Sequence, residues 1–165
     1  DIQQQGYQKT FNDLGIEYQG KSAKEICSGL VNYISDSADS KEDSVARIAT
    51  VNAMSKMYEY MENNNLELQS LDKVDNALME QVLSTYVECY IWGRILNDLQ
   101  FCLEKYSDDI DRTMKVEQEM KDYVSNKVRT TFQIKEIRDK IFGHHSIEDG
   151  IEALYEKCYS VLEDM

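Results

Sequence analysis

The chain has 165 residues, of which 42% are apolar and 30% charged, and its net charge is −13. Such a composition is globular, and the length suits one domain of about 100–200 residues. The acidic charge excludes general binding to nucleic acid or anionic membranes, because their phosphates would be repelled. No apolar run reaches the ~18–20 residues of a membrane span, and proline, which breaks helix interiors, is absent.

Three helices are expected in the first half of the chain, from capping residues followed by apolar residues at helical spacing. A short helix carries the apolar residues of 7–14, and the next begins at the capping box of 22–25. The third begins at Ser40 and ends at 63–65, since asparagine tolerates the left-handed conformation that ends helices. Its apolar positions are Val45, Ile48, Val51, Met54, Met57, Tyr58 and Met61.

The second half of the chain contains the most apolar stretch, residues 86–103, with the single tryptophan. This stretch is predicted to be the buried central helix of a segment that begins near Ser70 or Asp72 and bends at Gly93. A cap at 107–109 starts a helix of about 30 residues, kinked at its two adjacent threonines. Gly143 is expected to end that helix. A last helix follows, capped by Ser146 and carrying apolar residues from Ile147 to Leu162. The predicted fold class is all-α, a single compact bundle of about five to seven helices over residues 1–165.

The four cysteines are Cys27, Cys89, Cys102 and Cys158. Their even number and wide spacing favour two disulfides in a secreted protein; the alternative is four buried thiols in a cytosolic one. Cys89 and Cys102 lie on one helical stretch, roughly 20 Å apart, which is too far for one bond. Two pairings remain open: Cys27–Cys89 with Cys102–Cys158, or Cys27–Cys102 with Cys89–Cys158.

No enzyme signature is present, neither a glycine-rich phosphate loop nor a nucleophile elbow nor a zinc-binding His pair at helical spacing. His144 and His145 are the only histidines. Adjacent residues point in different directions, so they are expected to be plain turn residues and not metal ligands or partners of a catalytic cysteine. The prediction is a non-enzyme with no catalytic, cofactor-binding or metal residues and no cofactor.

Two groups of residues are candidates for contact with a partner. Residues 121–140 are locally basic, which suits an acidic partner or simply a solvated helix face. The basic residues are Lys121, Lys127, Arg129, Lys135, Arg138 and Lys140. The eleven tyrosines include close pairs at 58/60, 86/90 and 155/159, and tyrosine is favoured both at interfaces and in half-buried core positions.

The acidic balance, the four cysteines and the run Tyr155-Glu156-Lys157-Cys158-Tyr159 together resemble a known family. This is the C-terminal helical domain of the mosquito salivary 30-kDa antiplatelet family, that of the aegyptin and anopheline antiplatelet proteins. The resemblance covers most of the chain, and it implies that the chain is the C-terminal part of a longer secreted, extracellular protein. The acidic repeat half of that family is absent here, which puts functions that depend on it in doubt.

The resemblance implies a non-enzymatic salivary protein that binds collagen and thereby inhibits platelet adhesion and aggregation, impairing haemostasis. Carboxylates would pair with collagen Arg and Lys side chains, and tyrosines would pack on its proline-rich ridges. No binding residue can be carried over, because no motif fixes the alignment. The rival interpretations are a helical cytokine-like ligand, an insect small-ligand carrier and a cytosolic helical adaptor.

Overall fold

A computed structural model of the protein describes residues 21–35, 40–74, 76–105, 107–134, 136–137 and 147–165. These residues form helices joined by short turns, and no strand occurs in any of these ranges. The helices are α2 (Ala23–Ser35), α3 (Ser40–Asn63), the 3-10 turn η1 (Leu68–Leu71), α4 (Asn76–Asp98), α5 (Gln100–Glu104), α6 (Ile110–Gln133) and α8 (Ile147–Leu162). The predicted all-α class is therefore confirmed for this part of the chain, whereas the helix expected over 7–14 lies outside it.

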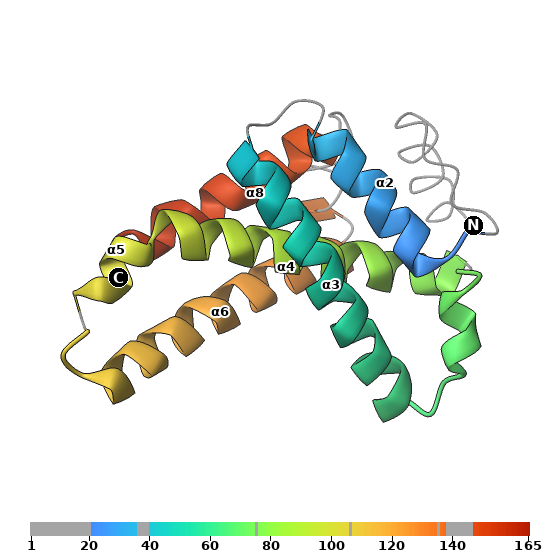
Figure 1. Ribbon diagram of the computed structural model, residues 1–165, viewed down its shortest axis with the longest axis horizontal. Coiled ribbons are helices and arrows are strands. Elements are labelled where there is room, and N and C mark those ends of the chain that lie inside the picture. The colour runs from blue at the N-terminus through green and yellow to red at the C-terminus, as the bar shows by residue number, and fades with distance from the viewer. Residues whose placement is uncertain (1–20, 36–39, 75, 106, 135, 138–146) are drawn as a thin grey trace.

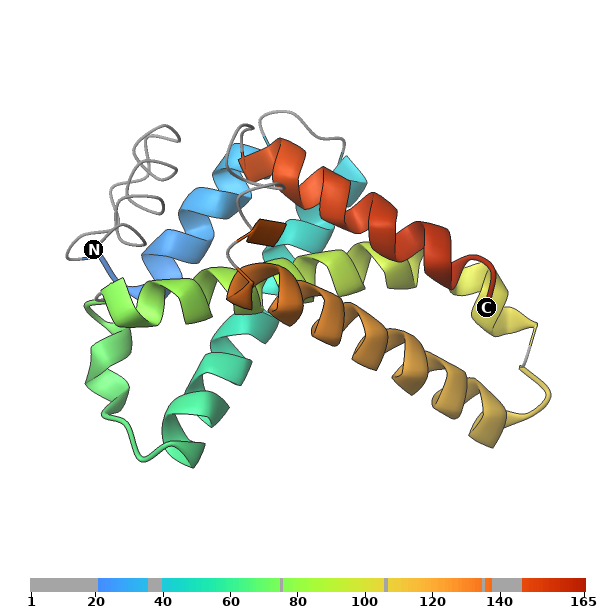
Figure 2. The ribbon, with the colours of Figure 1, turned by 180° about the vertical axis from the view of Figure 1, so that it is seen from behind.

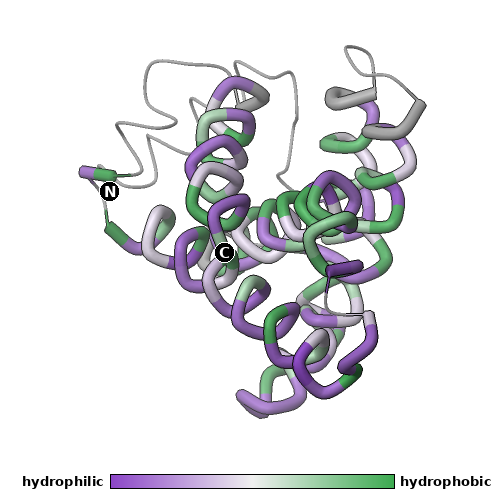
Figure 3. The backbone as a smooth tube through the Cα atoms, turned by 90° about the vertical axis from the view of Figure 1, so that its left-hand side faces the viewer, coloured by the Kyte–Doolittle hydropathy of each residue, from purple (hydrophilic) through white to green (hydrophobic). Residues whose placement is uncertain are grey.

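Helix α4 is the centre of the bundle. It packs against α2, α3, α5, α6 and α8, and Figure 1 shows α3 crossing it while α6 and α8 flank its second half. Seen from behind, α8 and α6 run alongside each other on the two sides of the second half of α4 (Figure 2). Each helix carries both hydrophilic and hydrophobic residues along its length (Figure 3). The prediction of a central helix with neighbours on several sides is thus confirmed.

The capping interactions predicted at three helix ends are present in the structure. Ser22 and Glu25 make a capping box, in which Ser22 N–H donates to Glu25 Oε2 (2.9 Å) and Glu25 N–H donates to Ser22 Oγ (3.1 Å). Asp109 caps α6 by accepting from the N–H of Arg112 at 3.0 Å. After α3, Asn65 takes a φ of 52°, the left-handed conformation that its short polar side chain tolerates.

Three boundaries differ from those expected. Helix α4 begins at Asn76 after the turn η1, and it runs through Gly93 to Asp98 before breaking at Leu99. Helix α6 passes through its two threonines and ends at Gln133, because Ile134 takes an extended conformation. The predicted Gly143 stop and Ser146 cap, with His144 and His145, lie outside the described residues.

The predicted disulfides are wrong. All four cysteines lie in the described ranges, and each is a free, buried thiol. Burial raises the pKa of the Cys27 thiol to about 12, and it raises those of Cys89 and Cys158 to about 11. The cysteines occupy apolar positions of α2, α4, α5 and α8, where a thiol packs as a small hydrophobic group. Neither of the two pairings left open by the sequence is formed.

Ellman's reagent should detect four thiols per chain once the protein is denatured without reductant. In the folded protein at about pH 8, Cys27, Cys89 and Cys158 should react slowly, because their thiols stay protonated far above the ordinary pKa of about 8.5 and are covered. A pre-reduced sample is the control. Recovery of fewer thiols from the untreated protein than from the reduced one would show that disulfides form after all.

Candidate functional site

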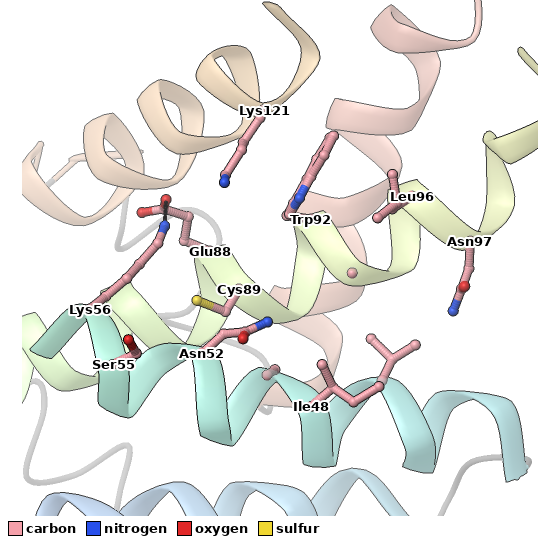
Figure 4. Close-up of a pocket in the computed structure, with 13 residues that line it drawn as sticks. Ile48, Asn52, Ser55, Lys56, Glu88, Cys89, Trp92, Leu96, Asn97 and Lys121 are labelled. Carbon is pink, nitrogen blue, oxygen red and sulfur yellow. Dashed lines mark hydrogen bonds and ion pairs between the residues drawn. The ribbon is translucent and has the colours of Figure 1, made fainter. Parts of the chain in front are cut away.

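The site is a pocket where α3 crosses α4, with one residue contributed by α6 (Figure 4). Its volume is about 390 Å³, at the lower end of the ~300–1,000 Å³ typical of ligand-binding clefts. Residues of α3 line one side, residues of α4 form the floor, and Lys121 reaches in from α6. The lining residues are Val45, Ile48, Ala49, Asn52, Ser55, Lys56, Glu88, Cys89, Trp92, Gly93, Leu96, Asn97 and Lys121.

Small residues bring α3 and α4 together at this crossing. A Cβ atom built on Gly93 would lie 3.0 Å from Val45 Cγ1, so the missing side chain permits the close approach. Helix α3 turns Ala46, Ala49 and Ala53 into the core. The hydroxyl of Tyr86 in α4 donates to the carbonyl of Ala46 at 3.2 Å, which holds the crossing in register. Val45 and Gly93 themselves belong to the pocket lining.

The sequence places Ile48 and Val51 among the apolar positions of their helix and Leu96 in the apolar stretch 86–103, but none of the three lies in the core. They are 58%, 69% and 36% exposed. Apolar residues of α3 recur at a strict spacing of three from Val45 to Met57, and each such step turns the helix by about 300°. The stripe therefore drifts round the helix by about 60° per step, so that its middle members leave the core. This drift can be read from the sequence. The alanines that take the core positions of those residues are harder to recognise, because alanine is only weakly hydrophobic.

The pocket combines an apolar floor with polar groups at its edge. Trp92 is half-buried and packs against the core; Leu96 lies next to it along α4, and Ile48 lies across the pocket on α3 (Figure 4). Lys56 Nζ is paired with Glu88 Oε1 at 2.5 Å, with side chains 38% and 17% exposed. The two opposite charges of this ion pair compensate each other, and the pair connects α3 to α4.

Lys121 is the cation of the pocket that has no counter-ion among the described residues, where it makes neither an ion pair nor a hydrogen bond. Its side chain points from α6 toward the space above the Lys56–Glu88 pair (Figure 4). Among the described lining residues, the charged side chains are thus two lysines and one glutamate, on a chain whose net charge is −13.

Cys89 is the one thiol in the pocket lining. Its pKa is raised to about 11, chiefly by burial; Lys56 and Lys121 act against that shift, and Glu88 adds to it. The thiol is therefore protonated near neutral pH and is a poor nucleophile. In the described ranges, no three His, Cys, Asp or Glu side chains are grouped to hold a metal ion, and no helix is long and apolar enough to cross a membrane.

The structure does not gather the predicted basic stretch on one face. Lys121, Lys127 and Arg129 lie on α6, where steps of six and two residues place them on different sides of the helix. Lys135, Arg138 and Lys140 lie outside the described residues. Among these cations, Lys121 lines the pocket.

Two of the tyrosine pairs considered for an interface belong to the core instead. Tyr86, Tyr90 and Tyr155 are buried, and the rings of Tyr86 and Tyr90 stack with centroids 6.5 Å apart. Tyr159 is partly buried against the core. Tyr58, which is 49% exposed on α3, remains on the surface.

Together, the described fold and its pocket define a helical bundle with a partly apolar binding surface between three helices. Residues 1–162 match the family model described as "Qat anti-phage system associated protein QatB", and the chain belongs to that family. No curated protein and no solved structure matches the chain.

Membership of a bacterial anti-phage family overturns the salivary resemblance and what it implied. The chain is not an inhibitor of platelet adhesion, collagen is not its partner, and assignment to the secreted, extracellular salivary proteins is wrong. The resemblance rested on acidity and cysteine number, which are bulk properties that unrelated helical proteins share. The supposed disulfides, which had favoured secretion, are free thiols.

Proposed function

We propose that the chain is a non-enzymatic, cytoplasmic component of a bacterial Qat anti-phage system, and that it binds another component of that system through the α3–α4–α6 pocket. Family membership supports the role in defence, and the four reduced cysteines suit a reducing compartment. The observation that carries the binding role is the set of exposed apolar side chains around an open pocket.

Ile48 and Leu96 line the pocket, and Val51 is exposed on the same helix as Ile48. Their exposure leaves apolar surface in water, and covering it gains about 25 cal/mol per Å². Trp92 lines the pocket together with Ile48 and Leu96, and tryptophan in a recess is typical of the residues that contribute most to protein–protein binding. The polar side chains of Asn52, Ser55 and Asn97 at the edge supply hydrogen-bonding groups of an interface rim.

Replacing Ile48 by glutamate should abolish co-purification of the chain with the other Qat components expressed with it, and also protection of the cells against phage. A carboxylate placed on this apolar side of the pocket would have to be buried by the bound partner without a counter-charge, which costs several kcal/mol. Because Ile48 is 58% exposed, the substitution should leave the fold intact. Helicity and thermal unfolding of the purified variant check this.

The matched control is Val161→Glu. Val161 lies on α8, is 44% exposed and does not line the pocket, so the same change there should leave both binding and protection unaltered. Equal binding by the two variants and the natural chain would overturn the proposed use of the pocket. Failure of the natural chain to bind any Qat component would overturn the binding role itself.

A further inference from the structure

We infer that two copies of the chain pair through the outer side of α3, in an antiparallel contact with a two-fold axis at Val51. The inference goes beyond the proposed function, because it concerns a different contact and is tested with this chain alone. Three observations carry it: a row of exposed side chains on α3, the lack of charge in that row, and the order of side-chain sizes along it.

The outer side of α3 carries exposed residues at alternating spacings of four and three, which place them on one face of the helix. They are Ser44, Ile48, Val51, Ser55 and Tyr58, and together they form the α3 stripe. The core residues Ala46, Ala49 and Ala53 are buried on the opposite face. Because α3 packs on α2 and α4 and crosses in front of α4 in Figure 1, the α3 stripe faces away from the bundle.

The α3 stripe contains no charged side chain, although 30% of the residues of the chain are charged. Arg47 and Glu59 flank it on opposite sides of the helix, and Glu62, one turn beyond Tyr58, marks its end. A solvated helix face ordinarily carries charged and polar residues, whereas charged residues are depleted at the centre of protein interfaces. The composition of the α3 stripe is therefore that of a contact surface.

The order of side-chain sizes makes the α3 stripe complementary to itself. Along the helix the sizes run small, large, medium, small, large, from Ser44 to Tyr58. A two-fold axis at Val51 brings Tyr58 against Ser44 of the second copy. It likewise brings Ile48 against Ser55, and Val51 meets its own counterpart. Each large side chain thus faces a small one, as in well-packed helix pairs. A two-fold dimer requires such self-complementarity, and contact with a different protein does not, so the occupant is a second copy.

Charge and size together set the strength of this dimer. Two chains, each with a net charge of −13, repel one another, and physiological salt screens that repulsion beyond about 8 Å. The α3 stripe is roughly 21 Å long and about 10 Å wide, which is smaller than the about 800 Å² per partner of a standard interface. The dimer is therefore weak and reversible, and added salt strengthens it because the contact itself contains no ion pair.

Sedimentation equilibrium of the purified chain tests the dimer itself. Measured from micromolar to millimolar protein, the average mass should rise from that of a monomer toward that of a dimer, and sodium chloride should increase the fraction of dimer. A chain that stays monomeric at millimolar concentration and high salt would overturn the inference. A dimer that salt dissociates would also overturn it, because such a dimer depends on opposite charges.

Val51→Glu should weaken dimerisation at least roughly tenfold, because two carboxylates would meet on the two-fold axis. Val51 is 69% exposed and does not line the pocket, so the variant keeps its fold, which circular dichroism checks. The matched control is Leu68→Glu. Leu68 lies in η1 and is 47% exposed, so this variant should dimerise as the natural chain does. Equal dimerisation by the two variants would contradict a contact at Val51.

Cysteine cross-linking locates the axis. In Val51→Cys the new thiols of two copies should form a disulfide with oxidised glutathione, which takes up their two electrons and two protons and becomes two reduced molecules. In Glu59→Cys the two new thiols lie roughly 24 Å apart along the antiparallel helices, too far for a bond. The natural chain, whose four thiols are buried, gives the background. Cross-linking at residue 59 as efficient as at residue 51 would overturn the two-fold axis.

These outcomes are separate from those of the proposed function. If the chain stays monomeric and Val51→Cys is not cross-linked, the dimer is wrong, whether or not a Qat component binds at the pocket. If the dimer forms and no Qat component binds the natural chain, the proposed function alone fails.

Discussion

Replacing Phe132 by alanine should lower the free energy of unfolding by about 3–5 kcal/mol, the usual cost of removing a buried aromatic side chain and leaving a cavity. Phe132 lies in the last turn of α6 and is 2% exposed. It is among the largest fully buried side chains described in the bundle, and it packs in the same core as α4 and α8. Urea unfolding followed by circular dichroism measures the loss.

Phe101→Ala is the matched control for this prediction. Phe101 belongs to α5 and is 55% exposed, so its removal leaves no cavity and should cost less than about 1 kcal/mol. If the two alanine variants lost equal stability, the assignment of Phe132 to the core would be wrong.

Replacing Arg94 by alanine should have the second-largest effect, about 2–3 kcal/mol, because this residue joins α4 to α8 in two ways. Its guanidinium pairs with Glu152 through Nη1 to Oε2 at 2.5 Å and Nη2 to Oε1 at 3.4 Å. It also lies 3.6 Å from the centre of the Tyr155 ring. Tyr155 in turn donates its hydroxyl hydrogen to Asp98.

The surroundings of Arg94 set the size of this effect. The Arg94 side chain is 12% exposed and that of Glu152 is 49% exposed, so water screens the ion pair and the stacked ring contributes much of the energy. Burial is the largest single influence and acts to lower the pKa of Arg94, but the hydrogen bond with Glu152 and the nearby Glu152, Tyr90 and Tyr155 together outweigh it, and the pKa is raised. The guanidinium is therefore charged at every pH at which the protein folds.

Arg47→Ala on α3 is the matched control for Arg94. The Arg47 side chain is 63% exposed and pairs with Asp43 one turn away on the same helix, at 3.0 Å. Such pairs contribute about 0.3–0.5 kcal/mol, so the control should be nearly neutral. A loss at Arg94 no greater than that at Arg47 in parallel urea titrations would contradict the proposed link between α4 and α8.

The sequence alone determined the local features of this protein. Each of three local features depends only on residues close in sequence: the capping box at 22–25, the cap at Asp109 and the left-handed Asn65. A short sequence pattern is therefore enough to predict them. The helical class follows in the same way, since apolar residues at helical spacing recur along the chain and proline is absent.

The tertiary structure alone decided which side chains form the core and which form the pocket. Gly93 looked like a bend, yet it is the contact point at which α3 meets α4. Ile48 belonged to an apolar stripe, yet it lines an open pocket because alanines of α3 face inward instead, and Leu96 of the apolar stretch 86–103 lines the same pocket. The four cysteines stay free, since pairing depends on distances between helices. These outcomes depend on how helices distant in sequence cross, and such contacts leave no periodic trace within a single helix.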